Sequence, residues 1–400
     1  MIRVGVDLGL AELRRTLRRA WSSAAALVVL AALTMTLAGL ADALERDSTG
    51  VLRSLDADVV VFNEEARLQL LRSRVPAPLG GSLAFIDGVR QAGTVGLVPT
   101  SLSVSGEEDR YRVTLVGYTA RTPAEPTNVV DGRVPLDGEP GIAAVDVRLR
   151  DRGIELGDTV TLAGDREVEI VGFVEDTMFL QQPTVWVPQD LWSRVRASAF
   201  PKAGWSEVLV GAAVVRTAAG ADRDEVAAAI VDELADLDDD IIELMGDEDA
   251  VDGIAVDAVP MGAALDAIPG VDVQRSTFTV IVALAVAVVG MVMGLLFALL
   301  VAERRPVLAT LRAVGATPMT VVVMLLTQVV ALWAVAAGGG TLATLALARV
   351  VPEAMPLALR PSVVATLAAA LLAASAIGAT VALRRVIRLD PATVMQENSE

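Results

Sequence analysis

The side chains that most often carry enzymatic chemistry are almost absent from this sequence. It contains no cysteine and no histidine, which excludes disulfides, thiolate nucleophiles, Ser-His-Asp triads and imidazole metal ligands. Its one lysine, Lys202, lies in Phe-Pro-Lys-Ala-Gly, whereas a phosphate-binding P-loop needs Gly-Lys-Ser/Thr after a glycine-rich turn. We therefore predict no catalytic, cofactor-binding or metal site, and no ATP hydrolysis by the P-loop route.

A cluster of acidic residues is the remaining candidate for a cation site. It consists of Asp236, Asp238, Asp239, Asp240, Asp247, Glu248 and Asp249. A calcium-binding EF-hand loop requires Gly at its sixth position and Glu at its twelfth, and residues 238–249 supply neither. We interpret the cluster as a solvated acidic face, which disfavours nucleic acid and anionic lipid headgroups as partners.

The whole sequence combines a high apolar content with a strong negative charge. Apolar residues make up 54% of 400 residues and the net charge is −17, so the two properties must be segregated along the chain. Four uncharged stretches rich in Ala, Val and Leu are long enough to cross a bilayer as helices, which takes about 20 residues. They are residues 20–41, 276–302, 313–348 and 361–383.

The charged residues indicate how these stretches are oriented. Arginines flank the first stretch at its start, occupy the link between the second and third, and follow the fourth, whereas residues 42–275 are strongly acidic. Short basic flanks stay in the cytoplasm. We therefore predict a multi-pass protein of the cell membrane, with both termini and the link at 303–318 inside and the acidic block outside.

This pattern predicts a membrane α-helical protein of four spans, with a large extracytoplasmic mixed α/β domain inserted between the first and second. The predicted parts are the cytoplasmic N-terminal segment 1–19, first span 20–43, outer domain 44–275, second span 276–302, cytoplasmic helix 303–318, third span 319–348, outer loop 349–360, fourth span 361–383 and cytoplasmic tail 384–400.

Two alternatives remain open at the N-terminus. Ala41-Asp42-Ala43 resembles a signal-peptidase site, but the apolar stretch before it is longer than the roughly 7–15 residues of a signal-peptide core. Residues 1–19 have leucines at near-helical spacing among the arginines. They are either an amphipathic helix on the inner surface or plain topogenic charge.

Several residues within the spans favour close helix packing. Gly290 and Gly294 form a small-xxx-small face, which suits packing within one subunit or at a dimer seam, and Gln328 is expected to form interhelical hydrogen bonds. The third span would be about 45 Å long as one helix. It must therefore project beyond the outer surface or break at Gly338–Gly340, where glycines disfavour helix.

The outer domain has the pattern of a mixed α/β fold. β-branched or alternating runs at 57–62, 111–116, 167–171 and 208–215 predict strands. Residues 222–237 have apolar side chains at helical spacing with acidic residues at the start, which predicts a helix.

Three motifs resemble a known family. The segment Glu303 to Ala316 is similar to the one after the second span of FtsX-like permeases of the MacB type. Leu389-Asp-Pro-Ala392 resembles that family's closing motif, and Leu156 to Val174 resembles a recurring outer-domain motif. The residues that match in the first segment are Glu303, Arg304, Leu311, Arg312, Ala313, Gly315 and Ala316. Val307 replaces the family's usual acid.

The resemblance implies a permease subunit of an ABC transporter rather than an enzyme. ATP would be bound and hydrolysed by a separate ABC-type ATPase chain, and the permease would pair with a second copy, as a homodimer or heterodimer. Residues 303–318 would form a coupling helix seated on the ATPase, with Leu308, Leu311 and Arg312 on one helical face. ATP-driven closure would then move the outer domains by mechanotransmission.

Three functions fit this reading. The first is export or extraction of a peptide, lipid or lipoprotein substrate, with or without an extracytoplasmic partner protein. The second is an FtsX-like signalling module that regulates a cell-wall hydrolase or sensor without transport. The third is a passive membrane-anchored binding protein. The size of the outer domain favours the first function, because the corresponding outer domain of FtsX itself is expected to be smaller.

Overall fold

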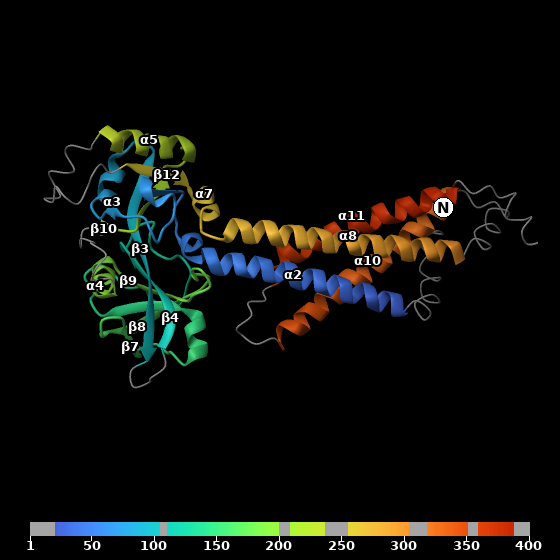
Figure 1. Ribbon diagram of the computed structural model, residues 1–400, viewed down its shortest axis with the longest axis horizontal. Helices are drawn as coiled ribbons and strands as arrows, with labels where there is room; N and C mark the ends of the chain where they lie inside the picture. The colour runs from blue at the N-terminus through green and yellow to red at the C-terminus, as the bar shows by residue number, and fades with distance from the viewer. Residues whose placement is uncertain are drawn as a thin grey trace, which may run out of the picture. The chain divides into compact units, whose positions relative to one another are not determined.

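The computed structural model describes residues 21–104, 110–199, 209–236, 255–303, 318–350 and 359–387. The chain divides into two compact units, shown as ribbons in Figure 1. The membrane unit comprises residues 1–43 and 274–400, and the α/β unit comprises residues 44–273. Helix α2 (Trp21–Ser54) and helix α8 (Val271–Glu303) each contribute residues to both units.

Four helices of the described chain are long and apolar enough to cross a membrane. Besides α2 and α8 they are α10 (Pro318–Ala348) and α11 (Pro361–Ile387). Proline begins both of the latter, as suits a first helical turn whose N–H groups have no partner within the helix. Helix α10 runs without interruption through Gly338–Gly340, so the predicted alternative of a break at these glycines is wrong.

The core of the membrane unit takes residues from all four helices. Leu27 and Met35 of α2 and Val289 and Met293 of α8 are buried in one cluster with apolar residues of α10 and α11. Large apolar side chains also face outward, as lipid contact requires, among them Leu284 and Leu295 of α8.

The α/β unit is built on one sheet of ten strands. The order β12-β1-β11-β3-β4-β9-β6-β8-β5 forms its main path, and β7 pairs with β3 and β8. Its strands are β1 (Val59–Asn63), β3 (Val89–Val104), β4 (Arg110–Tyr118), β5 (Val129–Gly132), β6 (Ile142–Asp146), β7 (Thr159–Leu162), β8 (Arg166–Val174), β9 (Thr184–Pro188), β11 (Ala212–Thr217) and β12 (Val256–Pro260). A separate pair joins β2 (Val75–Pro76) to β10 (Leu209–Val210).

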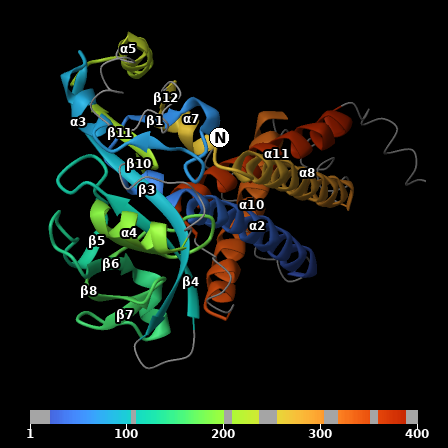
Figure 2. The same ribbon diagram turned by 60° about the vertical axis from the view of Figure 1, so that its left-hand side comes forward.

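Short helices complete the α/β unit. They are α3 (Leu79–Ser82), α4 (Gln189–Ala199), α5 (Arg223–Asp236), α7 (Met261–Asp266) and the 3₁₀ turns η1 (Glu64–Ala66), η2 (Leu83–Phe85) and η3 (Val147–Arg152). Figure 2 shows α4 lying across β3 and β4. Trp192 of α4 fits there because Gly96 and Gly117 leave room: a Cβ on either glycine would lie within 2.5 Å of the Trp192 side chain.

The strand predicted over 208–215 is wrong as a single element. The structure divides it at Gly211 into β10 and β11, which belong to different sheets. A Cβ at Gly211 would lie 2.8 Å from the carbonyl oxygen of Val95. The close approach of β3 therefore requires glycine there, and the chain changes direction at this point.

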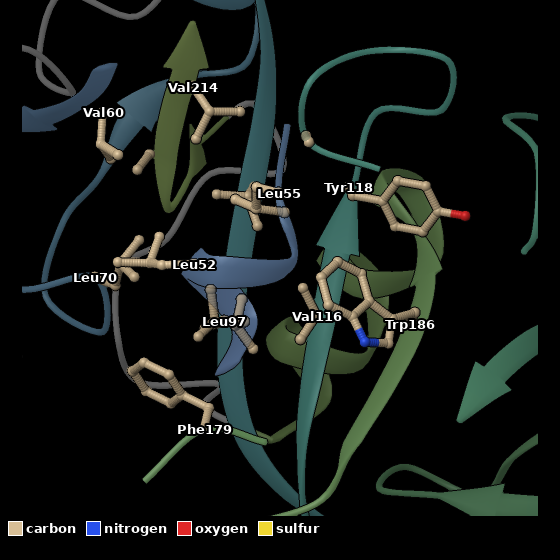
Figure 3. Packing of buried hydrophobic residues seen from close by; sticks show 14 of the residues in the cluster. Leu52, Leu55, Val60, Leu70, Leu97, Val116, Tyr118, Phe179, Trp186 and Val214 are labelled. Atoms are coloured by element: carbon tan, nitrogen blue, oxygen red, sulfur yellow. The ribbon is translucent and has the colours of Figure 1, made fainter. Parts of the chain in front are cut away.

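One apolar cluster of the α/β unit includes the end of α2. Leu52 of this helix and Leu55, just after its end, are buried with strand residues and with the ring pair Tyr118 and Trp186, as Figure 3 shows. The two rings meet edge to face, with centroids 5.8 Å apart, which is a favourable aromatic geometry. Val271, the first residue of α8, and Ile268, three residues before it, belong to the same cluster.

Candidate functional site

Most of the predicted coupling residues lie outside the described part of the chain. Glu303 is the last residue of α8 and is exposed. The other seven residues are Arg304, Leu308, Leu311, Arg312, Ala313, Gly315 and Ala316, all within 304–317, which the structure does not describe. The same holds for the acidic residues between 238 and 249.

Glycines Gly290 and Gly294 of α8 lie directly against α11. A Cβ on Gly290 would lie 2.7 Å from Cβ of Ala374, and a Cβ on Gly294 would lie 2.9 Å from Cα of Gly378. Real Cβ atoms do not approach so closely, so the contact depends on the absence of side chains. The structure therefore places both glycines in a seam within the subunit.

Helix α10 contacts α11 through polar groups as well. The indole Nε1 of Trp333 donates to the carbonyl oxygen of Ala368 at 2.8 Å. Gln328 is buried, and its Nε2 has no acceptor among the described residues. The hydrogen bond expected from this amide nitrogen is therefore not formed within the described chain.

A second seam joins α2 to α10. A Cβ on Gly340 would lie 2.8 Å from Cβ of Ala31, so the backbones are close. Thr344 is fully buried, and its Oγ1 lies 3.1 Å from the carbonyl oxygen of Ala32 and 3.4 Å from Oγ1 of Thr36. Each hydroxyl also has an acceptor in its own helix: Thr36 Oγ1 lies 2.8 Å from the Ala32 carbonyl oxygen, and Thr344 Oγ1 lies 3.0 Å from that of Gly340.

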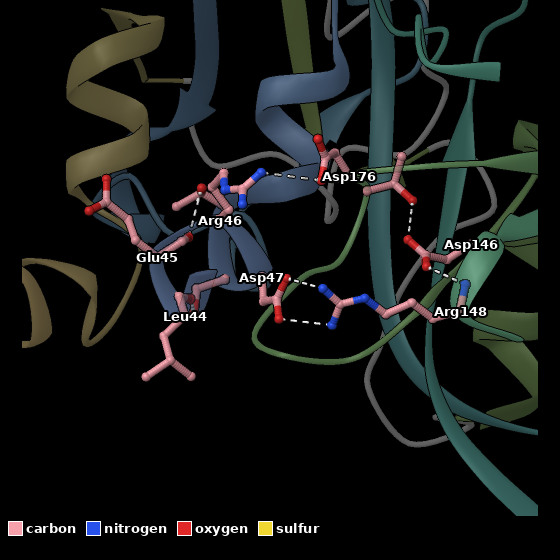
Figure 4. A network of polar contacts seen from close by, with 10 residues as sticks. Leu44, Glu45, Arg46, Asp47, Asp146, Arg148 and Asp176 are labelled. Carbon is pink, nitrogen blue, oxygen red and sulfur yellow. Dashed lines mark hydrogen bonds and ion pairs between the residues drawn. The ribbon is translucent and has the colours of Figure 1, made fainter. Parts of the chain in front are cut away.

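In the α/β unit, the end of α2 is held by ion pairs, which Figure 4 shows. The two guanidinium nitrogens of Arg148 donate to the two carboxylate oxygens of Asp47 at 2.8 and 2.9 Å. Arg46, the preceding residue, lies 3.7 Å from the carboxylate of Asp176. A bidentate Arg–carboxylate pair fixes orientation as well as distance.

Asp146 positions both of the segments that meet α2. One carboxylate oxygen accepts from the backbone N–H of Arg148 at 3.0 Å, which caps η3, and the other accepts from Thr177 Oγ1 at 2.8 Å. Thr177 is 2.7 Å from Thr184. Since Thr177 gives its proton to Asp146, Thr184 donates in that pair. Burial raises the pKa of the Asp146 carboxyl, against the hydrogen bonds that favour its charged form.

The described residues offer no cluster of side chains suited to a metal ion. No three His, Cys, Asp or Glu side chains of these residues gather in a way that suits an ion. The polar clusters that the structure does describe serve to join helices and strands.

Two family models match the sequence. A MacB-like periplasmic core domain matches residues 22–233, which is more than half of the chain, and an FtsX-like permease C-terminal domain matches residues 279–391. No curated protein matches the chain.

Solved structures with some likeness cover about half of this chain. The periplasmic region of MacB from Actinobacillus actinomycetemcomitans has 12% identity and a TM-score of 0.37, over 55% of this chain and 96% of that chain. The extracellular domain of the noncanonic ABC-type transporter YknZ from Gram-positive bacteria has 13% identity and a TM-score of 0.34, over 50% and 98%. Both scores are low, so the family assignment rests on the family models.

The described helices and the α/β unit together define a membrane protein with a large extracytoplasmic domain. The two matched models specify it further: the chain belongs to the FtsX/MacB-type permeases, a family of ABC transporter membrane subunits. This confirms the resemblance found in the sequence motifs.

Proposed function

We propose that this permease couples ATP hydrolysis by a separate ATPase chain to movement of its α/β unit, in the export or extraction of a peptide, lipid or lipoprotein. In this proposal the α/β unit is an extracytoplasmic insert between the first and second spans. Both termini and residues 304–317 are cytoplasmic, and the permease works as a dimer.

The continuity of α8 carries this proposal. This single helix of 33 residues begins at Val271, which is buried in the core of the α/β unit, and ends at Glu303, where the family's coupling segment begins. A helix of that length extends about 50 Å. A displacement of the segment after Glu303 would therefore be transmitted along one continuous helix to the α/β unit.

The role of the coupling segment is tested by a charge reversal. Arg312→Glu would replace a cation that donates to an ATPase carboxylate or carbonyl, so we expect less ATPase to co-purify, or ATP hydrolysis that no longer alters the α/β unit. Arg349→Glu is the matched control, because Arg349 is predicted to lie on the other side of the membrane.

The assay uses the full chain co-expressed with a candidate ABC-type ATPase that carries a P-loop. We expect hydrolysis by the complex and none by the permease alone. If no ATPase co-purifies, or if Arg312→Glu behaves like Arg349→Glu, the coupling role is rejected. Stimulation of hydrolysis by an added peptide or lipid would favour transport over signalling.

A further inference from the structure

The end of α2 (residues 44–54) meets the α/β unit at two levels along the helix. Leu52 and Leu55 are buried in the apolar cluster, and Asp47 pairs with Arg148 at 2.8 and 2.9 Å. Asp47 precedes Leu52 by five residues, or about 7.5 Å along the helix axis. One apolar anchor would let the helix pivot, whereas a second contact at this separation resists tilting.

A contact loop, residues 175–182, follows the helix between these two levels. The backbone N–H groups of Gln181 and Leu180 donate to the carbonyl oxygens of Asp47 (2.9 Å) and Ser48 (3.3 Å), and Val51 N–H donates to the Met178 carbonyl oxygen (3.3 Å). The main chains of helix and loop are thus joined directly.

Gly50 allows this close approach. A Cβ at Gly50 would lie 2.6 Å from the carbonyl oxygen of Met178 and 2.7 Å from that of Asp176. Any side chain at this position would push the loop away from the helix.

The backbone of the contact loop is strained. Asp176, Leu180 and Gln181 have φ angles of 54°, 46° and 63°, in the left-handed region that residues with a Cβ seldom adopt. Such conformations persist only where the surroundings fix them. Leu180 and Gln181 are the central residues of a tight turn closed by two backbone hydrogen bonds between Phe179 and Gln182. The contacts with α2 and the hydrogen bond from Thr177 to Asp146 hold this turn in place.

We propose that Asp47 and Arg148 are positioning residues that hold the end of α2 at a fixed angle on the α/β unit, so that the two move as one rigid body. Without the pair, the side chains no longer fix the helix at this level, and only the backbone bonds to the contact loop and the Arg46–Asp176 contact oppose a tilt about Leu52. The inference rests on the proposed function, because a stiff joint matters only in a protein that moves its α/β unit.

The pair is suited to control of angle more than to overall stability. The Arg148 side chain is 45% exposed, whereas that of Asp47 is only 9% exposed. Such a half-exposed pair contributes modestly to the free energy of folding, and in Arg148→Gln the side-chain amide can still donate a hydrogen bond to the Asp47 carboxylate. Loss of the pair should therefore loosen the joint while the α/β unit stays folded.

Spin labels test the joint in the full chain. The sequence has no cysteine, so cysteines replacing Leu44 and Glu167 carry the only labels; Leu44 lies on α2 before the ion pair, and Glu167 is exposed on β8. In nanodiscs, wild type should give a narrow distance distribution. Arg148→Gln and Asp47→Arg should each broaden it, and the swap Asp47→Arg with Arg148→Asp should narrow it again.

The matched control is Arg133→Gln. Arg133 forms a bidentate pair with Glu139 at 2.6 and 3.2 Å in the same unit. We expect it to leave the distribution narrow. A narrow distribution for Arg148→Gln, or equal broadening for Arg133→Gln, would overturn the inference.

The functional consequence is measured in the complex with the ATPase. Trapping with ATP and vanadate should alter amide hydrogen exchange in the α/β unit of wild type, and Arg148→Gln should lose that change while still hydrolysing ATP. Cysteines at Ser48 and Leu180, joined by a short thiol cross-linker, should restore the change in Arg148→Gln. If Arg148→Gln keeps the wild-type change, the inference fails. If no ATPase assembles, the proposed function fails, whereas the spin-label result still decides whether the joint is stiff.

Discussion

Gly294 of α8 and Gly378 of α11 face each other so closely that a Cβ on the first would lie 2.9 Å from Cα of the second. The relation is reciprocal, because a Cβ on Gly378 would lie 2.9 Å from Cα of Gly294. In a bilayer, helices are held together by such packing, since lipid tails remove the hydrophobic driving force.

Gly294→Ala should destabilise the membrane unit. The added methyl group meets backbone, which cannot rotate away, so the helices must separate, at a cost of about 1–3 kcal/mol. Thermal unfolding in detergent should show a lower Tm. Gly338→Ala is the control, because its Cβ would meet nothing within 4 Å, and it should show no loss. Equal Tm values for the two variants would contradict the seam.

Thr344→Val should weaken the seam between α2 and α10. Valine keeps the shape of threonine but removes the hydroxyl, which lies 3.1 Å from the Ala32 carbonyl oxygen across the seam and 3.0 Å from the Gly340 carbonyl oxygen within α10. Hydrogen bonds between membrane helices contribute about 0.6–1.7 kcal/mol, so a modest fall in Tm is expected. The control is Thr366→Val, whose exposed hydroxyl bonds only within α11, to Ser362. A fall as large in the control would show that the seam is not responsible.

The sequence predicted the membrane helices and several strands because these have strong local signals. Valine-rich runs became β1 and β8, and residues 222–237 became α5. The longest strand, β3, was not predicted. Its glycines and Pro99 lower strand propensity. Glycine is needed at position 96 because the side chain of Trp192, which is distant in the sequence, packs directly against it. Helix α4 was missed as well, since Trp192 becomes its anchor only after the sheet has formed.

The joint at the end of α2 was also missed. Asp47 and Arg148 are separated by 101 positions, and each is one of many charges in the acidic block. One local signal existed: no glycine or proline interrupts residues 42–49, so nothing ends the helix at residue 43. The helix in fact continues to Ser54. That Arg148 is the partner of Asp47 can be seen only once the sheet has formed. Asp146, at the end of β6, then binds both the backbone of Arg148 and Thr177 in the loop before β9.

Cysteine labelling tests the predicted topology. Single cysteines replacing Ser105 and Glu353 should react with a membrane-impermeant maleimide on intact cells, whereas cysteines at Thr317 and Ser399 should react only after permeabilisation. The expectation follows from the arginines that flank the spans. The background is free of thiols, because the chain has no cysteine. Labelling of Thr317 from outside would reverse the orientation.

Asp146→Asn should change how stability depends on pH. Burial raises the pKa of the Asp146 carboxyl, so between its unfolded and folded pKa values the folded state binds more protons than the unfolded state. The contribution of this carboxyl to stability is therefore present at low pH and decreases as pH rises. Asparagine has no such titration, and it can still accept the capping hydrogen bond from Arg148 N–H.

The Tm of Asp146→Asn, measured relative to that of wild type, should therefore increase as pH rises, for example from about pH 4 to about pH 8. The full chain in detergent can be followed by the fluorescence of its tryptophans, two of which, Trp186 and Trp192, are buried in the α/β unit. Asp151→Asn serves as the control for the loss of one carboxyl group, because Asp151 is exposed. A shift in favour of wild type at higher pH would mean that the hydrogen bonds from Thr177 and Arg148 to the charged carboxylate outweigh its desolvation.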